Sequence, residues 1–241
     1  MSLLLLAVAV PALAGMNIIS KPVDMYIRST HALNITKSNG AYVGGLSDGT
    51  FAVDFSDNMR AGTVPTCWPS WGNPPDVETK TPRVLCSNGA TSMTWDFNIP
   101  LRIFGVELAP RSPAMTATVT IRFMNQGTVV GCITRDLVAT SGRGGSCGCP
   151  GTPGNGGALL FAAEACDQRF TSVEIDSTTP FGAAQIRYAT YLGNVLTYNG
   201  NTGNLELGTT DIPKSGWYPL EAPSGAFVYI VTAKAGCTVT G

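Results

Sequence analysis

The sequence has little charge and almost no histidine, and both shortages exclude classes of function. Charged residues make up 13% of the chain, and 15 basic side chains nearly balance 16 acidic ones. Like charges do not run together, so the basic surface that binds nucleic acid or an anionic membrane is missing. His31 is the sole histidine, which argues against histidine-assisted catalysis and against histidine-rich metal sites. We therefore expect neither nucleic acid nor, after export, a membrane as a partner.

The chain opens with a short aliphatic run. Every side chain from Leu3 to Val10 is aliphatic, and Ala12 and Ala14 follow at the A-x-A spacing that signal peptidase accepts. The run is too short to cross ~30 Å of hydrocarbon as a helix. We therefore expect a signal peptide over residues 1–14 and a secreted, extracellular mature chain.

Cysteine usage agrees with export, because seven cysteines in 241 residues are better explained by disulfides than by free thiols. The odd number leaves one cysteine unpaired or paired between chains. We favour two bridges, each closing an irregular loop and worth ~3 kcal/mol in loop entropy. The expected pairs are Cys67 with Cys86, Cys132 with Cys166, and then Cys237 with Cys147 or Cys149.

Apolar and polar residues alternate along much of the chain with the period of β-strands. From Met115 to Phe123 the odd-numbered residues are apolar and the even-numbered ones are threonine or arginine, which indicates a half-buried antiparallel strand. Asn125-Gln126-Gly127 then predicts a hairpin turn. The segment from Ala158 to Cys166 fits one or two helical turns or a strand equally well. Further expected strands include 51–55, 93–99, 104–108, 170–175, 185–188, 195–198, 204–207 and 226–231.

About ten short strands separated by Gly- and Pro-rich loops predict an all-β fold, an antiparallel β-sandwich or jelly roll. The Gly-rich stretch from Gly142 to Gly157 is expected to be a loop. We expect one sandwich domain over residues 15–191. Residues 192–241 are expected to add either edge strands or a small appended hairpin layer to the same domain.

Four segments follow one another in a familiar order: Phe104–Pro110, Val119–Phe123, Phe170–Ile175 and Ala183–Tyr188. Their order resembles that of exported bacterial β-sandwich domains of the kind found in PEP-CTERM sorted proteins. The resemblance implies a surface or matrix protein with a lectin-like jelly-roll fold and no assigned catalytic residues. This chain ends at Cys237-Thr238-Val239-Thr240-Gly241 without a Pro-Glu-Pro anchor, so free secretion is expected rather than anchoring.

Two tryptophans in a proline-rich loop are the candidate ligand-binding residues. Trp68 and Trp71 would offer flat apolar platforms for sugar rings if they faced solvent. Trp217 and Tyr218 would extend this platform. The alternative is that the indoles fold inward and close one end of the sandwich.

Carboxylates are the remaining catalytic option. Glu174 and Asp176 share one strand face, and Asp96 and Glu107 lie on two other strands, so a glycosidase pair ~5–10 Å apart can be assembled from them. Alternation places all four on outward, solvated positions, and we therefore predict no catalytic residue. No cofactor or metal is expected apart from calcium, for which Asp48, Asp54 and Asp57 are the candidate ligands.

The sequence thus predicts a secreted, non-catalytic β-sandwich with a structural, adhesive or glycan-binding role. Extracellular polysaccharide or matrix is the expected partner. Two alternatives stay open: a carboxylate-dependent glycan hydrolase, and a subunit of an extracellular assembly joined through the odd cysteine.

Overall fold

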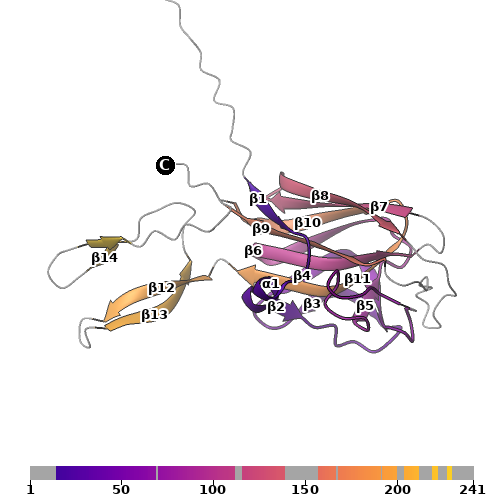
Figure 1. Cartoon of the computed structure of the whole chain (residues 1–241), viewed down its shortest axis with the longest axis horizontal. Helices are drawn as coiled ribbons and strands as arrows, with labels where there is room; N and C mark the ends of the chain where they lie inside the picture. The colour runs from indigo at the N-terminus through magenta and orange to yellow at the C-terminus, as the bar shows by residue number, and fades with distance from the viewer. Residues whose placement is uncertain are drawn as a thin grey trace, which may run out of the picture.

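A computed structural model shows an almost entirely antiparallel β protein (Figure 1). It describes residues 15–68, 70–111, 116–138, 157–166, 168–190, 192–199, 204–211, 219–221 and 227–229. The first eleven strands form one hydrogen-bonded sheet. They are β1 (Met16–Ile19), β2 (His31–Leu33), β3 (Tyr42–Ser47), β4 (Ala52–Thr63), β5 (Arg83–Cys86), β6 (Ser92–Pro110), β7 (Thr116–Asn125), β8 (Thr128–Val138), β9 (Leu159–Ala165), β10 (Phe170–Ser177) and β11 (Phe181–Thr190).

The sheet folds back on itself because β6 is long enough to belong to two layers. Its first half pairs with β4 and β10, and its second half pairs with β9 and β11. One layer is therefore β8-β7-β10-β6-β4, and the other is β1-β9-β6-β11. Strand β5 pairs with both β4 and β11 and joins the layers along one side. The expected sandwich-like fold is confirmed, although β6 has 19 residues and is not a short strand.

Inward side chains of both layers form one apolar core. On β7 these are Val119, Ile121 and Phe123, each fully buried, as the alternation predicts. The expected turn is also confirmed: Gln126 and Gly127 have φ values of 50° and 80°, the geometry that two-residue hairpins prefer. The segment 158–166, for which helix and strand were equally expected, contains strand β9 (Leu159–Ala165).

The outer face of the second layer is covered rather than exposed, which the sequence did not predict. A six-residue helix, α1 (Asp24–Ser29), packs Tyr26 against Ile103, Leu160 and Ala162. Residues 64–82, between β4 and β5, pack Trp68, Trp71 and Val77 on the same face; we call this segment the strap. Every described position of β6 from Ile103 to Pro110 is therefore buried.

Two smaller hairpins follow the large sheet. Strands β12 (Leu192–Asn199) and β13 (Asn204–Asp211) pair with each other, as do β14 (Pro219–Glu221) and β15 (Phe227–Tyr229). The pairings of the described residues do not join either hairpin to the large sheet. In the described part of the chain, no helix has the length and apolar character needed to span a membrane. The expected signal peptide, residues 1–14, lies outside the described residues.

Candidate functional site

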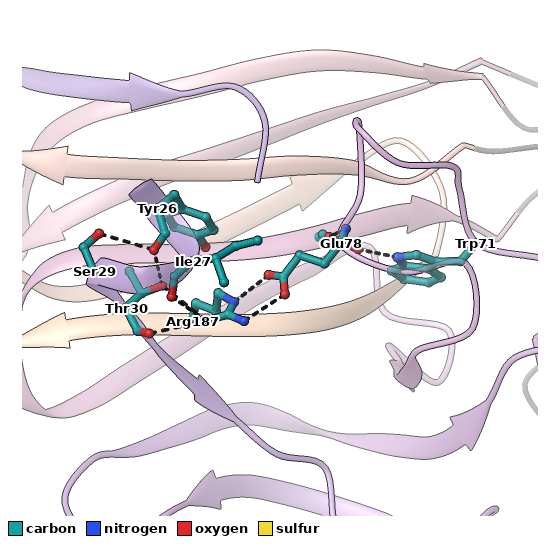
Figure 2. Close-up of polar contacts among 8 residues, drawn as sticks. Tyr26, Ile27, Ser29, Thr30, Trp71, Glu78 and Arg187 are labelled. Atoms are coloured by element: carbon teal, nitrogen blue, oxygen red, sulfur yellow. Dashed lines mark hydrogen bonds and ion pairs between the residues drawn. The ribbon is translucent and has the colours of Figure 1, made fainter. Parts of the chain in front are cut away.

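The most developed polar cluster lies between the strap, α1 and the outer face of β6 and β11 (Figure 2). Glu107, near the end of β6, is fully buried. One carboxylate oxygen accepts a hydrogen bond from Trp71 Nε1 at 2.7 Å, and the other accepts one from the Glu78 backbone N–H at 2.6 Å. Burial raises the pKa of Glu107 to about 7, although both donors and nearby Arg187 favour the ionised form.

Arg187 on β11 connects the strap to the helix. Its Nε and Nη2 donate to the two Glu78 carboxylate oxygens at 2.6 and 2.9 Å, a bidentate ion pair. Its Nη1 donates to the carbonyl oxygens of Ile27 and Thr30 at 3.2 and 3.3 Å. Figure 2 shows the guanidinium between α1 and the strap. Arg187 of the sheet therefore binds both segments that cover the outer face, the strap and α1.

A β-bulge places Arg187 on this face. Gln185 has a φ of 49°, and the pairing with β6 shifts between Ala184 and Arg187. An extra residue in one strand reverses which face the following side chains occupy. Because of it, Ile186 enters the central core and Arg187 faces the strap.

Tyr26 completes the cluster from the α1 side. Its ring is 3% exposed, and its hydroxyl lies directly over Gly105. Within the described part of the molecule this hydroxyl has no hydrogen-bond partner. Burial is the main cause that raises the pKa of Tyr26, so the phenol stays neutral.

This cluster is suited to holding segments in place, since Glu107 is buried and half-buried Glu78 is ion-paired with Arg187. Glu107 was expected on a solvated position, and that expectation is wrong because the strap covers it. Glu78, Arg187 and Tyr26 were not foreseen. The sequence did carry one signal: Glu107 is the single charged residue in the otherwise apolar stretch 103–110, and a charge in such a stretch is buried with partners if both strand faces are covered.

The two candidate tryptophans do not form an exposed platform. Trp68 and Trp71 are each 1% exposed. Their rings meet edge to face with centroids 5.8 Å apart, and Trp68 packs against Gly182 of β11. The indoles thus fold inward, as the alternative interpretation stated, but they cover the outer face of β6 and β11 rather than close one end of the sandwich. They do so because this face is apolar and is stabilised by removal from water. Trp217 and Tyr218 lie outside the described residues.

The other candidate carboxylates lie on the opposite, open face of the sandwich. Arg122 on β7 forms ion pairs with Asp176 and, at 3.6 Å, with Glu174, both on β10. Asp96 on β6 is exposed and lies opposite Asp54 on β4 and Ser172 on β10. The outward positions expected for Glu174, Asp176 and Asp96 are therefore correct.

These outward side chains form one continuous surface over β6, β10, β7 and β8, which we call the polar face. Its members are half-buried or exposed, and several hydrogen-bond across strands, as Thr120 does with Thr134 at 2.9 Å and Ser92 with Asp176 at 2.7 Å. The polar face consists of Ser92, Thr94, Asp96, Thr118, Thr120, Arg122, Cys132, Thr134, Asp136, Ser172, Glu174 and Asp176.

The calcium candidates do not meet at one point. Asp48 accepts hydrogen bonds from the backbone N–H groups of Thr50 and Phe51 and from the Tyr188 hydroxyl, so it fixes a turn. Asp57 accepts from the N–H of Asn58. Among the described residues, no group of three or more potential ligands is arranged to hold a metal ion.

The turn between β3 and β4 matches a hydrolase motif in its sequence. Gly45-Leu46-Ser47-Asp48-Gly49 matches the Gly-x-Ser-x-Gly pattern, whose serine acts from a turn between a strand and a helix. Here it lies at the turn between strands β3 and β4, and Ser47 Oγ accepts a hydrogen bond from the Gly49 N–H. His31 is exposed and lies beside the Tyr188 ring, 5.6 Å away. The segment therefore serves as a hairpin turn.

The oxidation states of the cysteines agree only in part with the expected disulfide pairs. Cys67, Cys86 and Cys166 are disulfide-bonded, whereas Cys132 is an exposed free thiol. The expected Cys132–Cys166 bridge is therefore wrong: Cys132 faces outward on β8 opposite Arg122, while Cys166 follows β9 in the other layer. The pairing of Cys67 with Cys86 stays a prediction. Cys147, Cys149 and Cys237 lie outside the described residues.

Comparisons with known proteins give little guidance. No protein-family model matches the chain, and no curated protein matches its sequence. A solved structure with some similarity is the enzymatically active domain of tailspike protein 4 from bacteriophage CBA120, at 15% identity and a TM-score of 0.28. The alignment covers 58% of this chain and 19% of the tailspike chain. Similarity at this level supports no conclusion about fold or function.

Proposed function

We propose that this protein is a secreted, non-catalytic β-sandwich that acts as a structural or adhesive module and contacts extracellular polysaccharide through its polar face. The observation that carries the proposal is the polar face itself: a broad, open sheet surface of hydroxyls and carboxylates around one guanidinium. Neighbouring strands lie ~4.8 Å apart, so donors and acceptors repeat at intervals that suit a hydroxyl-rich polymer.

The arrangement of the carboxylates supports a binder over an enzyme. Glu174 and Asp176 are paired with Arg122 on an open surface. Among the described carboxylic acids, the one with a strongly raised pKa is Glu107, which the strap covers. A glycosidase needs an acid with a raised pKa facing substrate beside a second carboxylate. Three oxidised cysteines support export, because such bridges persist in oxidising compartments.

Binding of the full chain to a panel of insoluble polysaccharides tests the proposal. We expect wild type to bind at least one polymer and the double variant Arg122→Ala, Glu174→Ala to bind it at least tenfold more weakly. The matched control is Lys21→Ala with Asp76→Ala, which removes another exposed ion pair, 3.0 Å long, at the strap. Both pairs are exposed enough that their loss costs little stability.

Two results would overturn this function. Wild type that binds none of the polymers, or binding that is equally strong in the double variant, removes the polar face as the contact surface. A reducing-end assay runs beside it: polymer cleavage by wild type that is lost in Glu174→Gln or Asp96→Asn would replace the binder with the glycan hydrolase.

A further inference from the structure

The buried cluster holds more negative than positive groups. The cluster contains two carboxylates, buried Glu107 of β6 and half-buried Glu78 of the strap, and one guanidinium, Arg187. Arg187 directs its hydrogen bonds to Glu78 and to the α1 carbonyls. The donors to Glu107 in the described part of the chain are neutral: the Trp71 indole N–H and the Glu78 backbone N–H. An ionised Glu107 therefore places a charge in the interior without a cation bonded to it.

Among the described residues, the other elements around Glu107 add no cation in contact with it. On the neighbouring strands its partners are Ala184 of β11 and Leu160 of β9. From α1 the facing titratable group is the phenol of Tyr26, and from the strap it is Glu78. Lys21 pairs with Asp76 in an exposed ion pair at the edge of the strap.

We propose that Glu107 is a proton-binding switch that sets how firmly the strap is held on the sandwich. With its proton, Glu107 is neutral and the strap lies seated on β6 and β11. Without it, the buried charge favours a state in which water reaches the carboxylate. This role is independent of polysaccharide binding at the polar face.

The strap, rather than the sheet, is the element that opens when Glu107 ionises. Strands β6 and β11 lie inside the large sheet and are paired on both sides. Among the described residues the strap has no strand pairing. Its backbone bonds to other elements include those from Gly157 and Ala158 to the Trp71 carbonyl at 3.3 and 3.1 Å and those from Cys67 and Trp68 to the Thr63 carbonyl at 2.7 and 3.1 Å. Segments outside the strand ladders open at lower free energy than core strands.

The direction of the pH effect follows from linkage. The pKa of Glu107 is about 7 with the strap seated and returns toward its ordinary value of 4.5 when water reaches the carboxyl group. For an acid with a raised pKa, the seated state is favoured most below the lower value. The free energy that favours the seated state over the open one falls as the pH rises toward about 7. Above that pH it falls no further.

Hydrogen exchange of the full chain from about pH 5 to about pH 8, corrected for intrinsic rates, tests the switch. We expect the protection of strap amides to fall at least tenfold over this range, as a pKa difference above one unit requires, while amides of β7 and β10 change little. Glu107→Gln should remove the pH dependence. Glu174→Gln, an acid substitution on the polar face, should retain it.

A second measurement uses wild type alone and does not depend on the folding of a variant. Infrared spectroscopy detects the carbonyl stretch of a buried protonated carboxyl apart from the carboxylate bands. We expect this band at about pH 5 and its loss above about pH 8. The switch is overturned by flat strap protection across the range, by pH dependence that survives in Glu107→Gln, or by absence of the band at low pH.

Discussion

At the scale of single residues, two of the fully buried indoles, Trp71 and Trp95, serve different purposes. The Trp71 N–H donates to Glu107 at 2.7 Å, whereas the Trp95 N–H has no partner among the described residues. Trp95 lies on the inward side of β6 among phenylalanines, with centroids 4.7 Å from Phe55 and 6.3 Å from Phe104. Trp71 therefore supports a polar group, and Trp95 fills apolar volume.

Trp71→Phe is expected to destabilise the protein more than Trp95→Phe. Both substitutions shorten a buried ring, but only the first removes a hydrogen bond and leaves a buried carboxylate with one donor, which costs about 1–3 kcal/mol. Urea unfolding at neutral pH measures the two changes. Equal losses of unfolding free energy would show that the Trp71–Glu107 hydrogen bond adds nothing to stability.

Residue positions on β7 could be predicted, while Glu107 could not. Alternation correctly places Ala117, Val119, Ile121 and Phe123 in the core, because one face of β7 is open to water. The same rule fails at Glu107, because both faces of β6 are covered there. Alternation separates two faces of a strand but does not reveal whether a distant segment covers the outer one.

At the scale of elements, the packing of α1 on the sheet depends on a glycine, because a side chain at that position would occupy the space that Tyr26 fills. Tyr26 reaches its buried position only because residue 105 of β6 is a glycine, and the hydroxyl occupies the place where a Cβ would lie. Arg187 holds the other end of α1 through the Ile27 and Thr30 carbonyls. The helix was not predicted, since six residues are too few to show a helical period and contacts with the sheet stabilise it.

Gly105→Ala is expected to displace Tyr26 and cost about 1–3 kcal/mol, as overpacking does in a closely packed site. The new Cβ would also lie 2.6 Å from the Ala162 Cβ, which cannot move away because it belongs to β9. Gly131→Ala is the matched control, since its nearest neighbour, 2.7 Å away, is the flexible end of Met16. Thermal unfolding compares them, and a larger loss in Gly131→Ala would contradict this account of α1.

At the scale of the whole molecule, strand β6 turns one sheet into two layers. The sequence predicted two strands here, 93–99 and 104–108, and the structure joins them into one strand that passes from the first layer to the second. The polar face covers the outside of the first layer. The strap and α1 cover the outside of the second (Figure 1).

Disulfides act at this scale because each one joins two separate positions of the chain. Cys67, Cys86 and Cys166 are oxidised and Cys132 is free, so we expect Cys132 to be the odd cysteine of the seven. A thiol reagent should label one cysteine per native chain, and Cys132→Ser should abolish the labelling, which mass spectrometry can follow. Labelling that persists in Cys132→Ser would show a second free thiol.

Cys132→Ser also tests the alternative that the protein is a subunit of an extracellular assembly joined through a disulfide. If Cys132 joined two chains outside the cell, non-reducing electrophoresis of freshly secreted wild type would show a dimer that Cys132→Ser lacks. A monomer in both cases would count against an assembly linked through this thiol.

The sequence by itself determined the β class, the inward residues of the half-exposed strands and the Asn125-Gln126-Gly127 turn, because each depends on neighbours a few positions apart. The tertiary structure decided that Trp68 and Trp71 face inward and that Glu107 is buried. It also decided that Arg187 faces the strap. These outcomes depend on residues 24–30, 64–82, 103–110 and 181–190 meeting at one face of the sheet, and on a one-residue bulge at Gln185. Local periodicity does not predict contacts between segments that lie far apart in the sequence.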